Sequence, residues 1–263
     1  MQAPHADGTE TEHGFVSLLP VADDRVRIVW LDGRETVSDG MMTLRTRTLT
    51  SAGGWGDETL LDPSVCDCCQ TAAVTTSRGV TVAYRDRTSD ETRDLYFTSL
   101  RDGTWTAPRA LHDDGWRISA CPVNGPALAA AGERVVATWF TGAGGVPRAY
   151  AAFSADGGDS FGDAVLLDAG ATLGRVHAAL LPDGSALLAR LDGSEGPAAV
   201  RLQRVHADGR VEPPVTVARS DAARASGFPR IAAIGDGTVL VVWTEPGEPG
   251  GLRAARVSLP SAP

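Results

Sequence analysis

A repeat of just over 50 residues is the feature that most constrains the fold of this chain. Each copy contains a short apolar strand, a Gly/Asp turn and a stronger apolar strand that ends at an anchor residue, which is aromatic in four copies. The anchors are spaced 54, 55, 51 and 53 residues apart in the 263-residue chain, at Trp30, Tyr84, Trp139, Arg190 and Trp243. A fixed period of this length indicates supersecondary units that bury a continuous core only when they stack.

Two further strands follow the anchor in most copies. Residues 42–47 and 94–98 alternate polar and apolar side chains as half-buried strands do. Four short strands per repeat are typical of a propeller blade. We therefore predict an all-β chain, a β-propeller of four-stranded blades that forms a single domain over residues 1–263. The repeats are expected at residues 9–62, 63–115, 116–168, 169–220 and 221–263.

The two ends of the chain leave the number of blades open. Residues 2–8 are similar to residues 106–115, the end of a fourth strand, and therefore predict an N-terminal strand remnant. The last copy ends after its third strand, near Val257. Pairing of the two ends would close a ring of five blades, whereas a six-bladed parent is the alternative.

A hairpin motif carries a family resemblance. Residues 154–161, Ser-Ala-Asp-Gly-Gly-Asp-Ser-Phe, match the Asp-box S-x-D-x-G-x-[ST]-[WF], and degenerate versions lie at residues 51–55 and 99–105. Asp caps the amides of the turn and Gly supplies its positive φ. Over nearly its whole length the chain thus resembles the sialidase (neuraminidase) superfamily and BNR-repeat propellers. Its Cys-Asp-Cys-Cys run, residues 66–69, looks like that of an uncharacterised bacterial branch. The resemblance implies a sialidase-like, exported protein, periplasmic or extracellular.

The chain departs from the catalytic pattern of the sialidases. That family uses three arginines, a tyrosine activated by a glutamate, and an aspartate as acid/base. The first-blade Arg-Ile-Pro motif has no counterpart here, and Tyr84, Tyr96 and Tyr150 lie within strand patterns that favour core packing. Sialidase activity is therefore implied by the resemblance alone, which is a statement about fold.

The chain's four cysteines fall in two short runs. Cys66, Cys68 and Cys69 lie in the second repeat, and Cys121 lies in the third, in the same alignment column as Cys66. In a propeller the first strand of each blade lines the central channel, and the segments before neighbouring first strands emerge on the same face. We therefore expect the sulfurs to approach one another at the mouth of the channel.

Three interpretations of these sulfurs stay open. Disulfides could join Cys66 or Cys68 to Cys121, or Cys66 to Cys69, and so staple neighbouring blades. Alternatively, the C-x-x-C spacing and the other two thiols predict a four-thiolate site for copper or zinc. His13 and His177 are the candidate additional ligands of that site. A strained Cys68–Cys69 disulfide or a reactive thiol is the third interpretation.

Charged side chains are expected on the same face. Arg175 and Arg230 are placed to bind a small anionic ligand or a glycan, and Arg85 and Asp86 belong to the loop after the second strand. A solvated rim with local ion pairs is the alternative for these loop charges.

Charge and hydropathy exclude two classes of partner. The net charge is −9 and all 24 basic residues are Arg, so no basic surface for nucleic acid is present. No apolar run reaches the roughly 18 residues of a membrane span, and the N-terminal residues contain no signal-peptide pattern. We expect a monomer that binds a soft metal, a small anionic ligand or both. An exo-α-sialidase-like glycoside hydrolase and a disulfide-stapled interaction scaffold are the alternatives.

Overall fold

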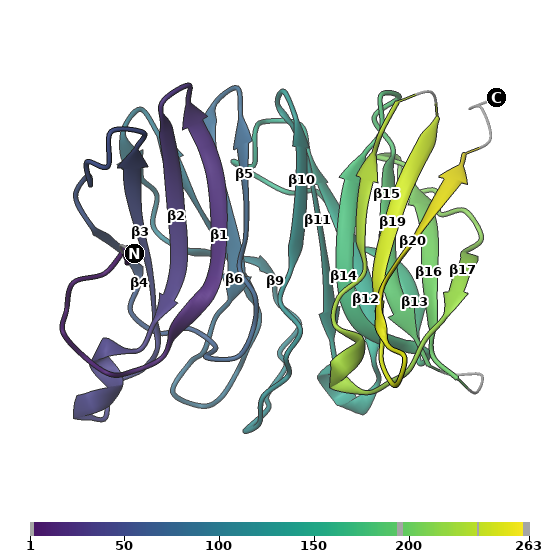
Figure 1. Ribbon diagram of the computed structural model, residues 1–263, viewed down its shortest axis with the longest axis horizontal. Coiled ribbons are helices and arrows are strands. Elements are labelled where there is room, and N and C mark those ends of the chain that lie inside the picture. Colours follow the sequence, from purple (N-terminus) through teal and green to yellow (C-terminus); the bar gives the residue numbers. More distant parts are fainter. Residues whose placement is uncertain (1–2, 194–196, 236, 260–263) are drawn as a thin grey trace. The chain divides into compact units, whose positions relative to one another are not determined.

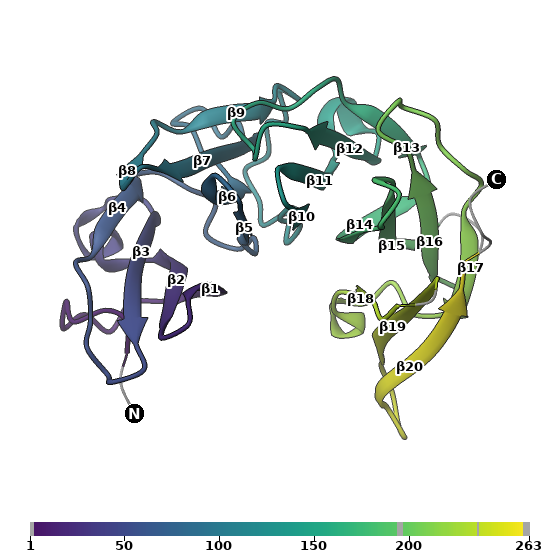
Figure 2. The same ribbon diagram turned by 90° about the horizontal axis from the view of Figure 1, so that it is seen from above.

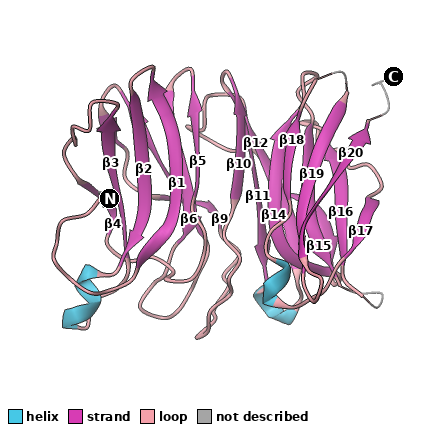
Figure 3. Cartoon of the chain, viewed as in Figure 1, coloured by secondary structure: helices cyan, strands magenta, loops and turns pink. Residues whose placement is uncertain are grey.

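The structure is a computed structural model that describes residues 3–193, 197–235 and 237–259. Over these residues the chain is all-β, and its only helices are three short 3-10 segments (Figure 3), η1 (Arg34–Ser38), η2 (Ala143–Gly145) and η3 (Arg224–Ser226). Within the same ranges no helix is long and apolar enough to cross a membrane.

The chain divides into two compact units, residues 1–125 and residues 126–263. The first unit holds two antiparallel sheets (Figure 1), each formed by consecutive strands. Its first sheet consists of β1 (His13–Ala22), β2 (Arg25–Asp32), β3 (Thr43–Thr50) and β4 (Thr59–Asp62). Its second consists of β5 (Ala72–Thr76), β6 (Gly79–Arg85), β7 (Leu95–Arg101), β8 (Thr104–Trp105) and β9 (Arg109–His112), with both β8 and β9 paired to β7.

The second unit holds three antiparallel sheets with the same strand order. The first consists of β10 (Ala127–Ala131), β11 (Arg134–Thr141), β12 (Arg148–Ser154) and β13 (Val165–Ala169). The next consists of β14 (Thr172–Leu180), β15 (Ala186–Asp192), β16 (Ala199–Val205) and β17 (Val215–Arg219). The last has three strands, β18 (Arg230–Ala233), β19 (Thr238–Glu245) and β20 (Gly251–Ser258).

The strand order in each sheet is the order of an up-and-down propeller blade. Neighbours in the sheet are neighbours in the chain, as Figure 2 shows for β14 to β17. The five sheets correspond one to one with the five repeats, which confirms the prediction of an all-β propeller built from blades. A single domain over residues 1–263 stays a prediction.

The anchor residues form the core of the blades. Trp30, Tyr84 and Trp139 are at most 1% exposed, and apolar residues of β2, β3 and β6 form one core cluster with Tyr84. Arg190 replaces the aromatic anchor in the fourth repeat and is only 2% exposed, with its Nη1 donating to Oε1 of Gln203 at 2.5 Å. The side-chain amide therefore provides the hydrogen bond that a buried guanidinium requires.

The first strands of the blades begin at two different places. β1 and β14 are long and carry a bulge at the same position, where Phe15 and Arg175 adopt the left-handed conformation with φ of 51° and 53°. β5 and β10 begin later, at Ala72 and Ala127. The segments before them are irregular and contain all four cysteines, and residues 67–68 form a turn before β5.

Residues 3–8 of the strand remnant expected at residues 2–8 form no strand, and residue 2 lies outside the described residues. They contact the first blade through side chains and turns instead. Asp7 receives hydrogen bonds from Thr9, and its carboxylate lies 3.3 Å from Nη2 of Arg34. The polar side chains of this segment therefore hold it against the first blade. The repeat pattern does not reveal these contacts.

Candidate metal centre

Three cysteine sulfurs from one short segment converge before the first strand of the second blade. The Sγ atom of Cys66 lies 3.3 Å from that of Cys69 and 3.7 Å from that of Cys68. All three sulfurs lie within 4.8 Å of one another. Thiolates that bind one tetrahedral zinc ion at about 2.3 Å lie about 3.8 Å apart, so the sulfurs have nearly the mutual spacing of metal ligands. We call Cys66, Cys68 and Cys69 the inner set.

Backbone pairing and a turn position the inner set. The N–H of Cys66 donates to the carbonyl of Arg85 at 2.9 Å, which fixes the segment to the end of β6. The next two residues form a turn. A turn brings residues three apart in sequence close together, so the C-x-x-C spacing directs Cys66 and Cys69 toward a common point.

A buried arginine lies beside the inner set. Nη1 of Arg93 is 3.4 Å from Sγ of Cys66 and 3.4 Å from Oδ1 of Asp67, and Nη2 is 2.7 Å from Oε2 of Glu91. Arg93 is only 3% exposed. Its positive charge offsets part of the negative charge that thiolates would bring to this site.

The thiols of the inner set have different proton affinities. Hydrogen bonds from Cys68 and Cys69, with a further one from Arg93, lower the pKa of Cys66. Burial raises the pKa of Cys69. One thiolate beside thiols that keep their protons is the state expected of a soft-metal site before it binds a cation, because metal binding displaces the remaining thiol protons.

Cys121 joins this group from the segment before β10. Its sulfur, the sulfur of Cys68 and a carboxylate oxygen of Asp67 lie within 4.8 Å of one another. We call these three residues the outer set. Cys121 is exposed, whereas Cys66 and Cys69 are 1% and 2% exposed, so the two sets share Cys68 but differ in access to solvent.

All four cysteines are free thiols in this structure. The sulfurs of Cys66 and Cys69 are the nearest pair described, at 3.3 Å. A disulfide would bring two sulfurs to about 2.05 Å, so the same turn could accommodate the oxidised form after a small movement.

His13, a candidate additional ligand, groups with other residues. Its Nε2 lies 3.0 Å from Oδ2 of Asp7, whose same oxygen lies 3.1 Å from Nδ1 of His5. We call His5, Asp7 and His13 the imidazole cluster. The two rings stack at 3.7 Å between centroids, with an angle of 7° between their planes. Nη2 of Arg34 lies 3.3 Å from the same oxygen of Asp7, so two imidazole rings and one guanidinium share a single carboxylate.

His177, the other candidate imidazole, lies on β14. Its Nδ1 accepts a hydrogen bond from the N–H of Ile231 at 3.2 Å. Burial, together with the nearby charge of Arg230, lowers its pKa to about 4. His177 is therefore neutral at physiological pH and connects the first strands of two blades.

Arg85 is buried rather than placed on a solvated rim. Its Nε and Nη2 donate to the carbonyl of Asn124 at 3.0 and 2.8 Å, and Nη1 donates to the carbonyl of Arg93 at 2.5 Å. The guanidinium also lies 4.8 Å from the ring centroid of Trp116. Arg85 therefore joins the segment of Asn124 to the loop of Arg93, next to the cysteines.

Asp86 follows Arg85 at the end of β6. Burial, together with the negative charges of Asp62 and Asp94, raises its pKa to about 7. Asp62 in turn accepts a hydrogen bond of 2.5 Å from the hydroxyl of Tyr84. Asp86 at the end of β6 therefore has two acidic neighbours, Asp62 at the end of β4 and Asp94 before β7.

Arg175 and Arg230 lie in the second unit. Arg175 donates from Nη1 and Nη2 to the carbonyls of Ala223 and Ala222 at 2.8 and 3.1 Å. Arg230 begins β18 at an exposed position. Nη1 and Nη2 of Arg175 therefore already donate to backbone carbonyls, and a ligand carboxylate would have to compete for the same N–H groups.

Local ion pairs account for several loop charges. Arg87 lies 2.6 Å from Glu91, and Arg117 lies 3.1 Å from Asp90. These pairs match the alternative interpretation of the loop charges.

Sequence reasoning did not single out Arg93, Asp67 or His5. Asp67 lies inside the cysteine motif, which is the signal that could have identified it. Arg93 is one of several arginines in a charged loop, and only the structure shows that it is buried against Cys66.

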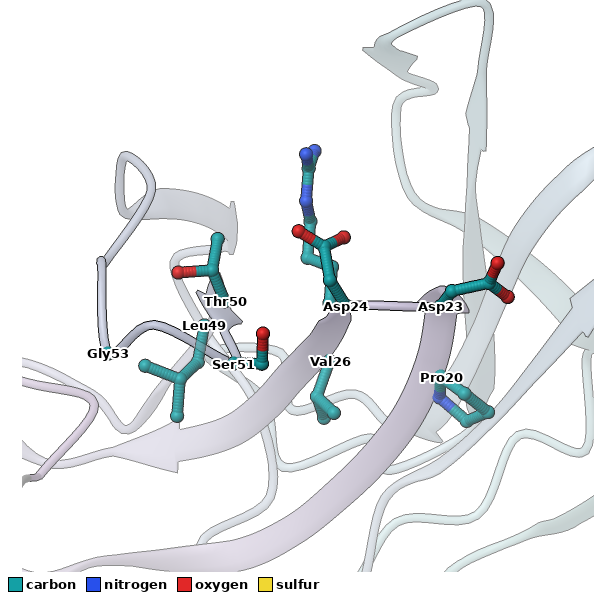
Figure 4. A pocket seen from close by; sticks show the side chains of 9 residues that line it. Pro20, Asp23, Asp24, Val26, Leu49, Thr50, Ser51 and Gly53 are labelled. Carbon is teal, nitrogen blue, oxygen red and sulfur yellow. The ribbon is translucent and has the colours of Figure 1, made fainter.

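A separate pocket of about 420 Å³ lies at the opposite end of the first blade (Figure 4). The turns β1–β2 and β3–β4 form it, with Asp23, Asp24 and Thr50 among the residues of its wall. No cysteine or histidine lines this pocket. β2 begins beside the pocket, and its other end, Asp32, lies 3.5 Å from His13 of the imidazole cluster.

The sequence matches no protein-family model and no curated protein. The fold is similar to that of the BP39L lectin from Burkholderia pseudomallei, with a TM-score of 0.58 and 15% identity over 89% of this chain and 63% of the lectin chain. The endo-arabinase from Bacteroides thetaiotaomicron VPI-5482 gives a TM-score of 0.49 and 13% identity over 94% of both chains. An alpha-L-arabinofuranosidase from Podospora anserina, solved in complex with cellotriose, gives 0.47 and 12% over 93% of this chain and 90% of that one. The lectin similarity supports the fold and does not single out the sialidases.

Proposed function

We propose that this β-propeller binds a soft metal ion, Cu(I) or Zn(II), through the thiolates of Cys66, Cys68 and Cys69. The observation that carries the proposal is the convergence of these three sulfurs within 4.8 Å on one turn. Sulfur ligands in this number and spacing suit both ions, and soft thiolates select them over magnesium or calcium. Arg93, 3.4 Å from the sulfur of Cys66, offsets the excess negative charge.

Elemental analysis of protein purified under reducing conditions, with a count of free thiols, tests this function. We expect about one zinc ion, or one or more copper ions, per chain, and loss of the metal in Cys69→Ser. Protein without metal and without free thiols would contradict metal binding and support the disulfide-stapled scaffold instead. Protein without metal but with four free thiols would contradict both.

A second candidate function is hydrolysis of glycans, and a specific observation favours it. Asp86 is a carboxyl whose pKa is raised to about 7 by burial and by Asp62, which is the property of a general acid at neutral pH. The resemblance to sialidases extends this candidate to sialic-acid-like substrates. Turnover of a fluorogenic sialoside that is lost in Asp86→Asn would support it, and absence of turnover would contradict it.

The same resemblance supports action outside the cytoplasm. Sialidase-type propellers of the branch with this cysteine motif are typically exported, so we place the metal-binding function in the periplasm or the extracellular space. Fractionation of the source cells, with detection by an antibody against the purified chain, tests this placement.

A further inference from the structure

The two overlapping sets of donor atoms differ in their access to solvent. The inner set contains Cys66 and Cys69, which are 1% and 2% exposed. The outer set contains exposed Cys121 and the carboxylate of Asp67, whose side chain is 40% exposed. Cys68, half-buried, belongs to both sets. A metal carrier in solution can therefore reach the outer set directly, whereas the buried sulfurs of the inner set are screened from it.

The segment that carries Cys121 is clamped from two sides. The side-chain amide of Gln70 donates to the carbonyl of Gly125 at 3.0 Å and accepts from its N–H at 2.9 Å. A Cβ at Gly125 would lie 2.0 Å from the carbonyl oxygen of Gln70, so only glycine permits this approach. Arg85 holds the carbonyl of Asn124 with two further hydrogen bonds. Contacts from Gln70 and Arg85 thus hold the segment that places Cys121 beside Cys68.

A strained residue lies within this loop, two residues after Cys121. Val123 has a φ of 50°, a conformation that is costly for a β-branched residue and that persists only where the surrounding structure enforces it. The backbone of the segment that carries Cys121 is therefore held in place by its surroundings.

We propose that Cys121 is the acquisition ligand of a metal relay, in which Cu(I) binds first to the outer set and then moves to the inner set while Cys68 stays bound. The inference rests on the proposed metal binding by the inner set. In the transfer, the bonds from the metal to the sulfur of Cys121 and to the carboxylate oxygen of Asp67 break as the bonds to the sulfurs of Cys66 and Cys69 form. The metal stays Cu(I), and the thiol proton that Cys69 loses passes to the departing thiolate of Cys121.

Ligand chemistry gives the transfer its direction. The outer set offers two thiolates and a carboxylate, whereas the inner set offers three thiolates, and Cu(I) prefers sulfur to oxygen. Arg93 beside Cys66 further offsets the charge of the inner thiolates. A small-thiol complex of Cu(I), such as Cu(I)–glutathione, is the class of donor that fits, because its own thiolate can exchange with Cys121.

The test compares loading rates and equilibrium binding of Cys121→Ser with those of Ala120→Ser, a matched change at the exposed neighbour. Cu(I)–glutathione is mixed with reduced protein in a stopped-flow instrument, and the equilibrium affinity is measured by competition with bathocuproine disulfonate. We expect Cys121→Ser to load at least about tenfold more slowly, with unchanged stoichiometry and an affinity within about threefold of the parent. Ala120→Ser should load at the parent rate, and Asp67→Asn should slow loading by a smaller factor.

Two results would overturn the relay while leaving metal binding intact. Loading of Cys121→Ser at the parent rate would show that Cys121 is not on the path. An affinity loss of about a hundredfold or more would make Cys121 a permanent ligand of one site. A parent protein that binds no Cu(I) at equilibrium would overturn the proposed function itself, and the relay with it. Thermal unfolding of each variant verifies that it is folded.

Discussion

The first and second blades carry a carboxylate at the same position, two residues after the anchor, in opposite electrostatic surroundings. Asp32 in the first blade is fully buried and accepts hydrogen bonds from Nε1 of Trp30 at 2.8 Å and from Arg34 at 2.7 Å. These hydrogen bonds outweigh the effect of burial, and the pKa of Asp32 is lowered. Asp86 in the second blade has acidic neighbours, and burial raises its pKa to about 7.

The segments in front of these blades differ in the same way. The imidazole cluster in front of the first blade has its own cation in Arg34, 3.3 Å from Asp7. The inner set in front of the second blade combines three sulfurs with one arginine, Arg93. The comparison teaches that equivalent positions of a repeat can carry different chemistry in neighbouring blades, according to which charges the neighbouring loops supply.

The largest expected effect concerns the internal ion pair of the first blade. Asp32→Ala removes the acceptor of a buried donor on Trp30 and of a partly buried donor on Arg34, and should cost about 3–5 kcal/mol in the free energy of unfolding. Asp67→Ala, at a side chain that is 40% exposed, should cost at most about 1 kcal/mol. Urea denaturation measures both values, and equal losses would remove the distinction between the two blades.

The next effect separates the two clusters by metal binding. Cys69→Ser should weaken Cu(I) or Zn(II) binding at least about a hundredfold, or about 2.7 kcal/mol, because a direct sulfur ligand is lost. His13→Gln should leave the affinity within about threefold, because His13 belongs to the imidazole cluster. Equilibrium competition with a chromophoric chelator measures both. A large loss in His13→Gln would make His13 a ligand after all.

The two carboxylates should give opposite dependences of stability on pH. Asp86 keeps its proton in the folded state up to about pH 7, whereas the unfolded carboxyl loses its proton near 3.8. The unfolded state therefore binds fewer protons between these values, and the stability contributed by Asp86 falls as the pH rises through this window. Asp32, with a lowered pKa, contributes stability above about 3.8 that is lost as the pH falls through its folded pKa.

Asp86→Asn should accordingly stabilise the protein more at pH 8 than at pH 5, by about 2 kcal/mol after allowance for partial solvation. Urea denaturation of both proteins at pH 5, 6, 7 and 8 measures the difference. A difference in the free energy of unfolding between the two proteins that stays constant across these pH values would show that Asp86 ionises normally in the folded state.

The smallest expected effect concerns the contact between the two blades. The hydroxyls of Ser17 and Thr71 lie 2.7 Å apart, at equivalent positions of the first and second repeats. Ser17→Ala removes this hydrogen bond and should cost about 1 kcal/mol, while Thr71 keeps its bond to the carbonyl of Phe15. Thermal unfolding measures the change, and an unchanged stability would mean that water replaces the lost hydroxyl.

The sequence by itself determined the blades and the local convergence of the thiols. The alternation of apolar side chains and the regular spacing of anchors such as Trp30 and Trp139 are local properties, so each sheet could be predicted from its own repeat. The C-x-x-C spacing of Cys66 and Cys69 likewise describes a single turn.

Only the tertiary structure decided which side chains meet across loops. It placed Arg93 against Cys66, Cys121 beside Cys68, and His13 with His5 rather than with the sulfurs. These contacts join residues of separate segments, and they depend on backbone conformations, such as the left-handed Val123, that no periodic pattern encodes. The arginines beside Asp7 and beside Cys66 are likewise set by the tertiary structure. The interaction of two charges depends on their distance in space and not on their spacing in sequence.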